Sequence, residues 1–189
     1  AGGSTRLGQP KQLLPFRGAT LLGWVVSQVA SAASLDEVVV VLGGAAVEVR
    51  QRVDFGRAKV VENPAFGEGC GSSYGAGIAT LDPQAEAVAV LLGDQPGIEA
   101  AVIDHVVETW RQGGDAVVVA SCQGRLGHPI VFGRDLFSRL AGLKGDKAAW
   151  KLLAAHPEWV RPLEVDRPLP LDVNTRQDYQ SAVGAERRA

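Results

Sequence analysis

Methionine is absent from this chain of 189 residues, cysteine occurs only twice, and aromatic residues make up 6% of it. Two cysteines, Cys70 and Cys122, are too few for a disulfide framework or for a zinc site made only of cysteines. We therefore expect a reduced, cytoplasmic environment. No run of about 18 or more apolar residues occurs, and a run of that length is what a membrane-spanning helix requires.

An excess of charge of one sign is also missing. The chain has 19 basic and 21 acidic residues, and its net charge is −2. A generic nucleic-acid binder would be strongly basic, so we expect no nucleic-acid partner. The lack of a long apolar run leads us to expect no membrane partner. Hydrophobic residues make up 46% of the chain, which is too many for a disordered acidic protein. The length fits one domain of ordinary size.

The chain opens on a glycine turn, Ala1-Gly2-Gly3. Glycine turns normally connect secondary-structure elements, so we expect a strand ahead of residue 1. We expect residues 1–189 to form a single domain, in which 184–189 are a flexible tail.

Short β-branched runs alternate with longer stretches that have helical periodicity. The runs predict strands at 38–42, 87–92, 116–120 and 129–132, because continuous apolar character is typical of strands covered on both faces. A 3.6-residue spacing of apolar side chains predicts helices at 20–33, 73–81, 99–112, 134–141, 146–155 and 176–183. The proline-rich segment 157–170 is either a functional loop or an edge strand. This alternation predicts an α/β fold, a three-layer sandwich with a mostly parallel, Rossmann-like sheet.

Ligands of such folds bind at the carboxyl ends of the strands, and three segments there carry suitable chemistry. The opening loop has three glycines, Gly2, Gly3 and Gly8, whose backbone can approach an anion closely. Arg6 and Lys11 add positive charge, so the loop is suited to a polyphosphate. The alternative is a surface turn with two solvated bases.

Two further segments carry oxygen ligands. Asp94 directly follows the apolar run at 87–92, where its carboxylate suits Mg²⁺; alternatively it caps a helix beginning near Pro96. Asp172 and Asn174 are spaced i, i+2 on an extended segment, so their side chains point to one side and suit a second metal contact. The alternative for Asn174 is a simple helix N-cap. The sequence leaves open which of Asp172 and Asn174 binds the metal.

Four ordered motifs resemble nucleotidyltransferases of the molybdenum cofactor type, over positions 1 to about 180. The resemblance is strongest to the molybdenum cofactor cytidylyltransferases, although Ala1-Gly2-Gly3 is closer to their guanylyltransferase relatives. The motifs are Gly2-Gly3-Ser4-x-Arg6-Leu7-Gly8-x-Pro10-Lys11, Gly93-Asp94-x-Pro96, Gly127-His128-Pro129 and Asp172-Val173-Asn174-Thr175.

The resemblance implies a nucleotide-diphospho-sugar transferase type of fold and assigns roles to these positions. It implies that the loop binds the NTP phosphates through Gly2, Gly3, Ser4, Arg6, Gly8 and Lys11. Asp94 is then the Mg²⁺ ligand, with Asp172 and Asn174 completing the metal sphere. Asn63, Ser72 and Ser73 contact the base and ribose, and His128 belongs to an acceptor-side loop.

The implied activity is transfer of an NMP group from an NTP, with CTP favoured, to a phosphorylated acceptor such as the molybdopterin cofactor. Pyrophosphate is released, and the product passes to a molybdoenzyme or its chaperone. Guanylyltransferase activity with GTP, transfer to a sugar phosphate, and a non-catalytic nucleotide-binding accessory module remain alternatives.

Overall fold

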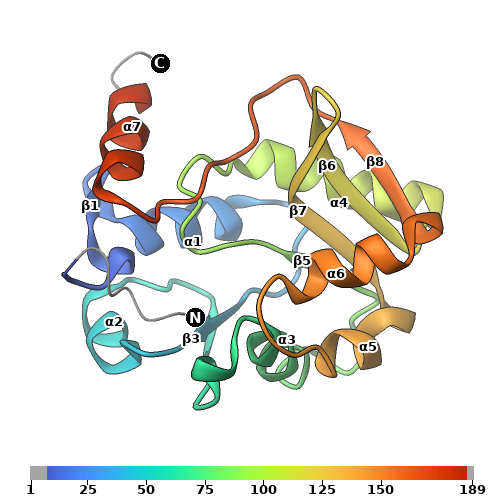
Figure 1. Cartoon of the computed structure of the whole chain (residues 1–189), viewed down its shortest axis with the longest axis horizontal. Coiled ribbons are helices and arrows are strands. Elements are labelled where there is room, and N and C mark those ends of the chain that lie inside the picture. Colours follow the sequence, from blue (N-terminus) through green and yellow to red (C-terminus); the bar gives the residue numbers. More distant parts are fainter. Residues whose placement is uncertain (1–7, 187–189) are drawn as a thin grey trace.

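A central β-sheet lies between two layers of helices in the computed structural model of this chain, which describes residues 8–186 (Figure 1). The strands are β1 (Pro15–Phe16), β2 (Ala19–Thr20), β3 (Val39–Leu42), β4 (Lys59–Glu62), β5 (Ala87–Val90), β6 (Val117–Cys122), β7 (Arg125–Gly133) and β8 (Val160–Glu164).

The helices fill most of the connections between these strands. The α-helices are α1 (Leu21–Ser31), α2 (Ala46–Arg52), α3 (Gly71–Ile78), α4 (Ala100–Gly113), α5 (Phe137–Ala141), α6 (Ala148–Ala155) and α7 (Arg176–Glu186). Short 3-10 helices are η2 (Lys11–Leu13), η3 (Phe66–Glu68), η4 (Arg134–Leu136) and η5 (Pro157–Trp159). Within residues 8–186, no helix combines the length and the apolar character that crossing a membrane requires.

The strand pairing is mixed. Four strands hydrogen-bond in the order β5-β7-β6-β8, with β7 antiparallel to both neighbours and β8 parallel to β6. Strands β3 and β4 form a separate parallel pair, and β1 and β2 form a small antiparallel hairpin. The α/β class is therefore confirmed, but the described sheets are mixed rather than mostly parallel. The reason is local: Gln123 and Gly124 both have positive φ, 52° and 73°, and their two-residue turn sends β7 back along β6.

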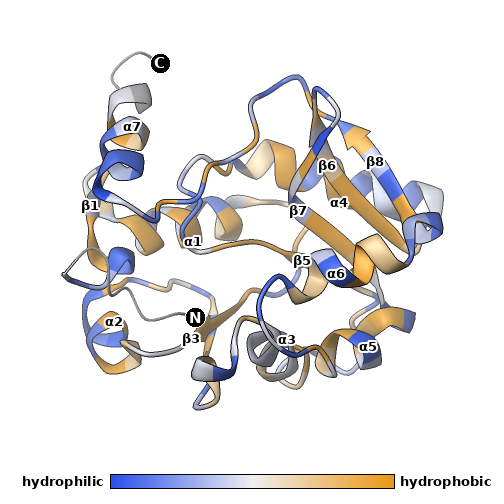
Figure 2. Cartoon of the chain, viewed as in Figure 1, coloured by the Kyte–Doolittle hydropathy of each residue, from blue (hydrophilic) through white to orange (hydrophobic). Residues whose placement is uncertain are grey.

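The two central strands of the four-stranded sheet, β6 and β7, are mostly buried on both faces, as their continuous apolar runs predict. Helices α1 and α4 cover one face, where Val106 packs in the same core cluster as Val118. Helices α5 and α6 cover the other, where Leu140 and Leu153 pack with Phe132. Figure 2 shows this arrangement as hydrophobic strands between helices that carry hydrophilic residues on their outer sides. This burial leaves the ends of the central strands and the exposed edge strand β8 as the accessible parts of the sheet.

The predicted elements are confirmed with small changes at their ends, and several short elements are missing from the prediction, the longest of them β4 and α2. The segment 157–170 contains an edge strand, β8, which was one of its two alternatives. Strand β4 has only two apolar residues between Lys59 and Glu62, too few for a recognisable run. Helix α2 is short, and Val47 within it is 70% exposed, so it lacks an apolar stripe.

Candidate active site

The position of Lys11 is fixed by the two leucines that follow it. Leu13 and Leu14 are buried in two different core clusters, which anchors the 3-10 turn η2 to the body of the molecule. From this turn the Lys11 side chain reaches the end of β5. Its ammonium donates hydrogen bonds to Asp94 Oδ2 and to Asn174 Oδ1, the latter at 2.9 Å. Three segments that are far apart in the sequence therefore meet at one ammonium group.

Asp94 lies in the loop that leaves β5, and two hydrogen bonds fix this loop. The backbone carbonyl of Asp94 accepts from the amide of Val173 at 2.9 Å, and the Trp24 indole donates to the carbonyl of Pro96 at 2.9 Å. Helix α4 begins only at Ala100 and has no side-chain cap. The capping alternative for Asp94 is therefore wrong, and its carboxylate instead pairs with Lys11.

The side chain of Asn174 is not the helix cap. Thr175 and Asp178 form a reciprocal capping box: the Thr175 amide donates to the Asp178 carboxylate at 2.7 Å, and the Asp178 amide donates to the Thr175 hydroxyl at 3.1 Å. Hydrogen bonds from the Asn174 amide and from Thr175 lower the pKa of Asp178. Because Thr175 caps α7, the side-chain oxygen of Asn174 is available to the Lys11 ammonium.

Gln95 is a site residue that the sequence reasoning missed. It is buried, and its side-chain amide donates to Asp172 Oδ1 at 2.8 Å. This contact, together with the Val173–Asp94 backbone hydrogen bond, fixes the 172–174 segment against the loop after β5. The available signal was its place between Asp94 and Pro96 in a segment already assigned to the ligand edge. Asp172 is thus engaged by Gln95, whereas Asn174 contacts the cation beside Asp94.

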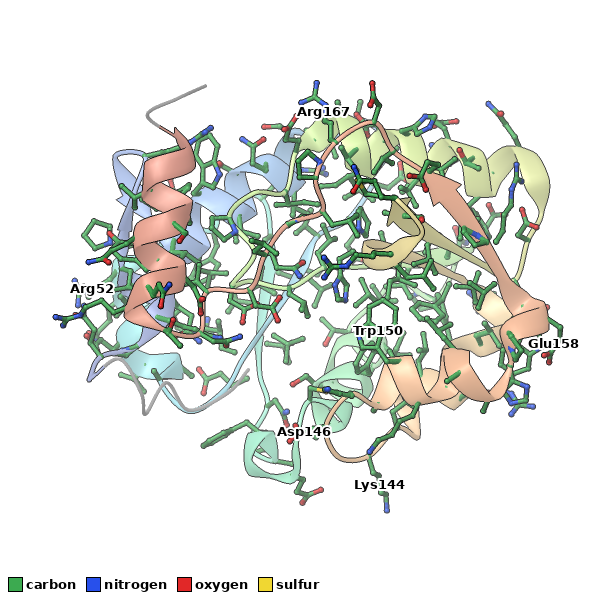
Figure 3. All side chains as sticks on the ribbon, turned by 45° about the horizontal axis from the view of Figure 1, so that its top comes forward. Arg52, Lys144, Asp146, Trp150, Glu158 and Arg167 are labelled. Atoms are coloured by element: carbon green, nitrogen blue, oxygen red, sulfur yellow. The ribbon has the colours of Figure 1, made fainter. Side chains whose placement is uncertain are left out.

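His128 on β7 is 4% exposed and packs edge-on against Trp150, with 5.6 Å between ring centroids. Trp150 itself is on α6 and is labelled in Figure 3. Burial lowers the pKa of His128 to about 4, and the nearby charges of Asp172 and Asp94 partly oppose this shift. The imidazole is therefore neutral near pH 7. No hydrogen bond to its ring is made by any residue in the described part of the chain. The neutral ring has one donor and one acceptor nitrogen, and it lies close enough to Asp172 and Asp94 to feel their charges.

The low pKa of His128 makes stability depend on pH. In the unfolded chain the imidazole is protonated below about pH 6.5, but in the folded protein only below about 4. The free energy of unfolding is therefore unaffected by this group above about pH 6.5, and it falls as the pH is lowered from 6.5 towards 4. At about pH 5 we expect a loss of about 2 kcal/mol relative to about pH 7 from this group. Urea unfolding of the wild type and His128→Asn at both pH values measures it. Equal pH dependence of the two proteins would contradict the assignment.

Asn63, directly after β4, forms a second polar cluster with Ser72 and Ser73 in the first turn of α3. The buried Asn63 amide donates to the Ser72 hydroxyl at 2.8 Å and to the Ser73 hydroxyl at 3.2 Å, and Asn63 Oδ1 accepts from the Ala65 amide at 3.0 Å. The structure thus brings these three predicted residues together. Their hydrogen bonds to one another fix the shape of the loop at the carboxyl end of β4.

This loop rests on the segment that precedes α6. The Gly71 amide donates to the Gly145 carbonyl at 2.9 Å, and the Cys70 amide donates to Asp146 Oδ1 at 3.3 Å. Figure 3 shows Asp146 and Lys144 on that segment, below α6. A Cβ atom at Gly69 would lie 2.6 Å from the carbonyl carbon of Gly145, so only glycine permits this contact. The two loops therefore form one packed unit at this edge.

Part of the predicted glycine loop lies outside the described residues. These positions are Gly2, Gly3, Ser4 and Arg6. Gly8 has a φ of +69°, a conformation that favours glycine, and a Cβ atom at this position would have no heavy atom within 4 Å. Glycine is therefore favoured at position 8 by the backbone conformation and not by lack of space. That the Gly8 backbone binds an NTP phosphate stays a prediction.

The residues at the end of β5 fit a divalent metal ion. A carboxylate oxygen of Asp94 and an amide oxygen of Asn174 are hard ligands, and both already contact a single positive group, the Lys11 ammonium. No group of three or more His, Cys, Asp or Glu suited to a metal occurs within the described part of the chain. Two oxygen ligands supplemented by substrate phosphates are the usual arrangement for Mg²⁺.

Comparison with known proteins places this geometry in a family. Residues 1–160 match the family model of the MobA-like NTP transferase domain. Nicotine blue oxidoreductase of Paenarthrobacter nicotinovorans is 33% identical over 164 residues, which are 83% of this chain and 79% of that protein. The crystal structure of Rv0371c from Mycobacterium tuberculosis H37Rv has a TM-score of 0.87 at 37% identity, covering 97% of this chain and 94% of that one.

A second structure of the mycobacterial protein was determined as a complex with manganese. It is 35% identical, has a TM-score of 0.82, and covers 97% of this chain and 95% of that one. The family model spans most of this chain, and the expected family resemblance is thereby confirmed. This chain belongs to the family of MobA-like NTP transferases.

Proposed function

We propose that this protein is a Mg²⁺-dependent nucleotidyltransferase that moves an NMP group, CMP in the first instance, from an NTP to a phosphorylated acceptor such as the molybdopterin cofactor. The observation that carries the proposal is the contact of Lys11 with Asp94 and Asn174 at the end of β5. It combines positive charge for phosphates with an oxygen pair for a metal. Membership of an NTP transferase family supports the class of reaction.

In the proposed reaction an oxygen of the acceptor phosphate attacks the α-phosphorus of the NTP. The bond from the α-phosphorus to the bridging oxygen of the β-phosphate breaks, and pyrophosphate leaves with that electron pair. Such transfers need little covalent help from the protein, because positioning and charge neutralisation supply most of the rate enhancement. When bound, Mg²⁺ would neutralise charge developing on the phosphate oxygens.

The site residues divide into three groups under this proposal. Lys11, with Arg6 and the loop residues Gly2, Gly3, Ser4 and Gly8, binds the phosphates. Asp94 and Asn174 hold the metal, whereas Asp172, engaged by Gln95, positions the segment that carries Asn174.

The remaining predicted residues are assigned to the two substrates. Asn63, Ser72 and Ser73 shape the loop that faces the base and ribose. His128 contributes a neutral hydrogen-bonding group on the acceptor side.

Thermal shift with CTP, GTP, ATP and UTP in the presence of Mg²⁺ or Mn²⁺ tests nucleotide binding. A nucleotide at a hundredfold excess over its Kd is expected to stabilise the folded protein by about 2.7 kcal/mol. Pyrophosphate release is then measured with a panel of phosphorylated acceptors, including a molybdopterin. A shift with CTP and acceptor-dependent pyrophosphate release are the expected results. If none of the four nucleotides shifts the unfolding temperature, the proposal is overturned.

The same experiments distinguish the alternatives. A larger shift and faster turnover with GTP would identify a guanylyltransferase, and turnover only with sugar phosphates would identify a sugar-phosphate enzyme. Nucleotide binding without pyrophosphate release would favour a non-catalytic accessory module. One relative is named an oxidoreductase, so oxidation of NADH or NADPH without NTP would favour that class instead.

Location and downstream partner complete the proposal. Both cysteines, Cys70 and Cys122, are free thiols, which supports a reducing, cytoplasmic location. A nucleotidylated pterin product would be handed to a molybdoenzyme or its chaperone.

A further inference from the structure

The Lys11 ammonium contacts both of the proposed metal ligands, Asp94 and Asn174, at the position that a metal ion would take. It donates to Asn174 Oδ1 at 2.9 Å and pairs with Asp94 Oδ2. The side chains of Lys11 and Asp94 are only 18% and 20% exposed, so water screens this pair less than an ion pair on the open surface. The positive charge of Lys11 therefore neutralises the one carboxylate that a metal would need.

We propose that in the nucleotide-free protein Lys11 acts as a built-in cation that excludes the divalent metal, and that metal binds only when Lys11 moves from Asp94 and Asn174 to the phosphates of the NTP. This inference rests on the proposed function, in that it takes Asp94 and Asn174 as the metal ligands. It adds that metal and nucleotide enter the site together rather than independently.

The two oxygen ligands are fixed, and the lysine is the part that can move. Asp94 is fixed by its backbone hydrogen bond from Val173, and Asn174 directly precedes the Thr175–Asp178 capping box. The Lys11 ammonium, in contrast, sits at the end of a flexible four-carbon stem. Rotation about that stem can carry the charge away while the backbone of η2 stays anchored by Leu13.

The exclusion follows from charge and space. An ammonium and a divalent ion cannot both contact Asp94 Oδ2 and Asn174 Oδ1, because like charges at contact distance repel strongly in a partly buried site. NTP phosphates give Lys11 an alternative anionic partner, which frees Asp94. By linkage, nucleotide must then raise metal affinity by the same factor by which metal raises nucleotide affinity.

The test measures the affinity of nucleotide-free protein for Mn²⁺, by electron paramagnetic resonance of the free ion or by calorimetry. Mn²⁺ is the ion present in a structure of the mycobacterial relative. Lys11→Met removes the charge but keeps most of the stem, and we expect it to bind Mn²⁺ about tenfold more tightly than the wild type. Lys11→Arg keeps the charge and is expected to bind Mn²⁺ as weakly as the wild type.

Two controls locate the effect. Lys151→Met removes a charge from the exposed outer surface of α6 and is expected to leave Mn²⁺ affinity unchanged. Adding Asn174→Ala to Lys11→Met is expected to abolish the gain. Equal Mn²⁺ affinity of wild type and Lys11→Met, or a gain that survives Asn174→Ala, overturns the inference.

The inference and the proposed function fail in different measurements. Mn²⁺ affinity is read without nucleotide and without turnover, whereas the proposed function is read from nucleotide-induced stabilisation and pyrophosphate release by the wild type. A wild type that turns over NTP, beside a Lys11→Met protein with no gain in Mn²⁺ affinity, would refute the inference alone. Thermal unfolding of each variant confirms that it is folded before its affinity is compared.

Discussion

Asp94→Ala is expected to lower the rate of nucleotidyl transfer by about a thousandfold, the upper range for loss of one preorganised charge-stabilising group. Asp94 supplies a carboxylate that pairs with the Lys11 ammonium at the end of β5. Its removal leaves Asn174 alone to hold a metal and leaves the Lys11 charge without its carboxylate partner. The rate is measured as pyrophosphate release from the preferred NTP with a saturating acceptor.

Two variants isolate the role of charge. Asp94→Asn preserves the shape of the side chain and an oxygen ligand but removes the negative charge, and we expect it to lose nearly as much activity as Asp94→Ala. Asp135→Asn makes the same chemical change at an exposed position in η4 and is expected to keep wild-type activity. Activity of Asp94→Ala within a few-fold of the wild type would remove the metal and phosphate roles assigned to this site.

Gly69→Ala is expected to lower the free energy of unfolding by about 2–5 kcal/mol. Gly69 has φ 97° and ψ 174°, a backbone conformation that is essentially confined to glycine. The added Cβ would also lie 2.6 Å from the carbonyl carbon of Gly145 and 2.9 Å from the amide nitrogen of Asp146. These are backbone atoms, so the loop has to separate from the segment before α6. Urea unfolding followed by circular dichroism measures the change.

The same loop provides a matched control. Gly67 lies two positions earlier and does not have a left-handed φ, and a Cβ atom added there would have no heavy atom within 4 Å. Gly67→Ala is therefore expected to change stability by less than about 1 kcal/mol. Separation of the loop would also disturb Ser72, whose hydroxyl donates to the Gly69 carbonyl, so Gly69→Ala should weaken nucleotide binding as well. Equal stability of the two variants would show that the contact at Gly69 is not restrictive.

The sequence predicted the elements whose patterns are local and strong. β-branched runs located β3, β5, β6 and β7, and a continuous apolar stripe located α1 and α4. Strand β4 was missed because Val60 and Val61 are flanked by charged residues, and pairing with β3 rather than burial of a long run stabilises it as a strand. The mixed sheet was missed because the direction of β7 depends on the turn at Gln123 and Gly124, and this dipeptide is not a distinctive turn sequence.

The candidate site was predicted in part. Asp94, Lys11 and Asn174 were identified singly, each with a structural alternative: a helix cap for Asp94 and Asn174, and a solvated surface base for Lys11. The contacts in the structure excluded two of these alternatives. The Asp94 carboxylate pairs with Lys11 and does not cap a helix, and Thr175 rather than Asn174 caps α7. Gln95 was missed because a buried glutamine has no recognisable signature until its partner, Asp172, is in place.

The sequence by itself determined the α/β class, the position of Asp94 at the end of an apolar strand, and the presence of the last helix, α7. These depend on interactions within a few residues of chain, which composition and periodicity record directly. Only the tertiary structure decided that Lys11 meets Asp94 across 83 positions and Asn174 across 163, and that Asp172 is bound by Gln95 instead. Those contacts arise because separate strands and loops end at one edge of the sheet, and no local pattern specifies which of their side chains come within hydrogen-bond distance there.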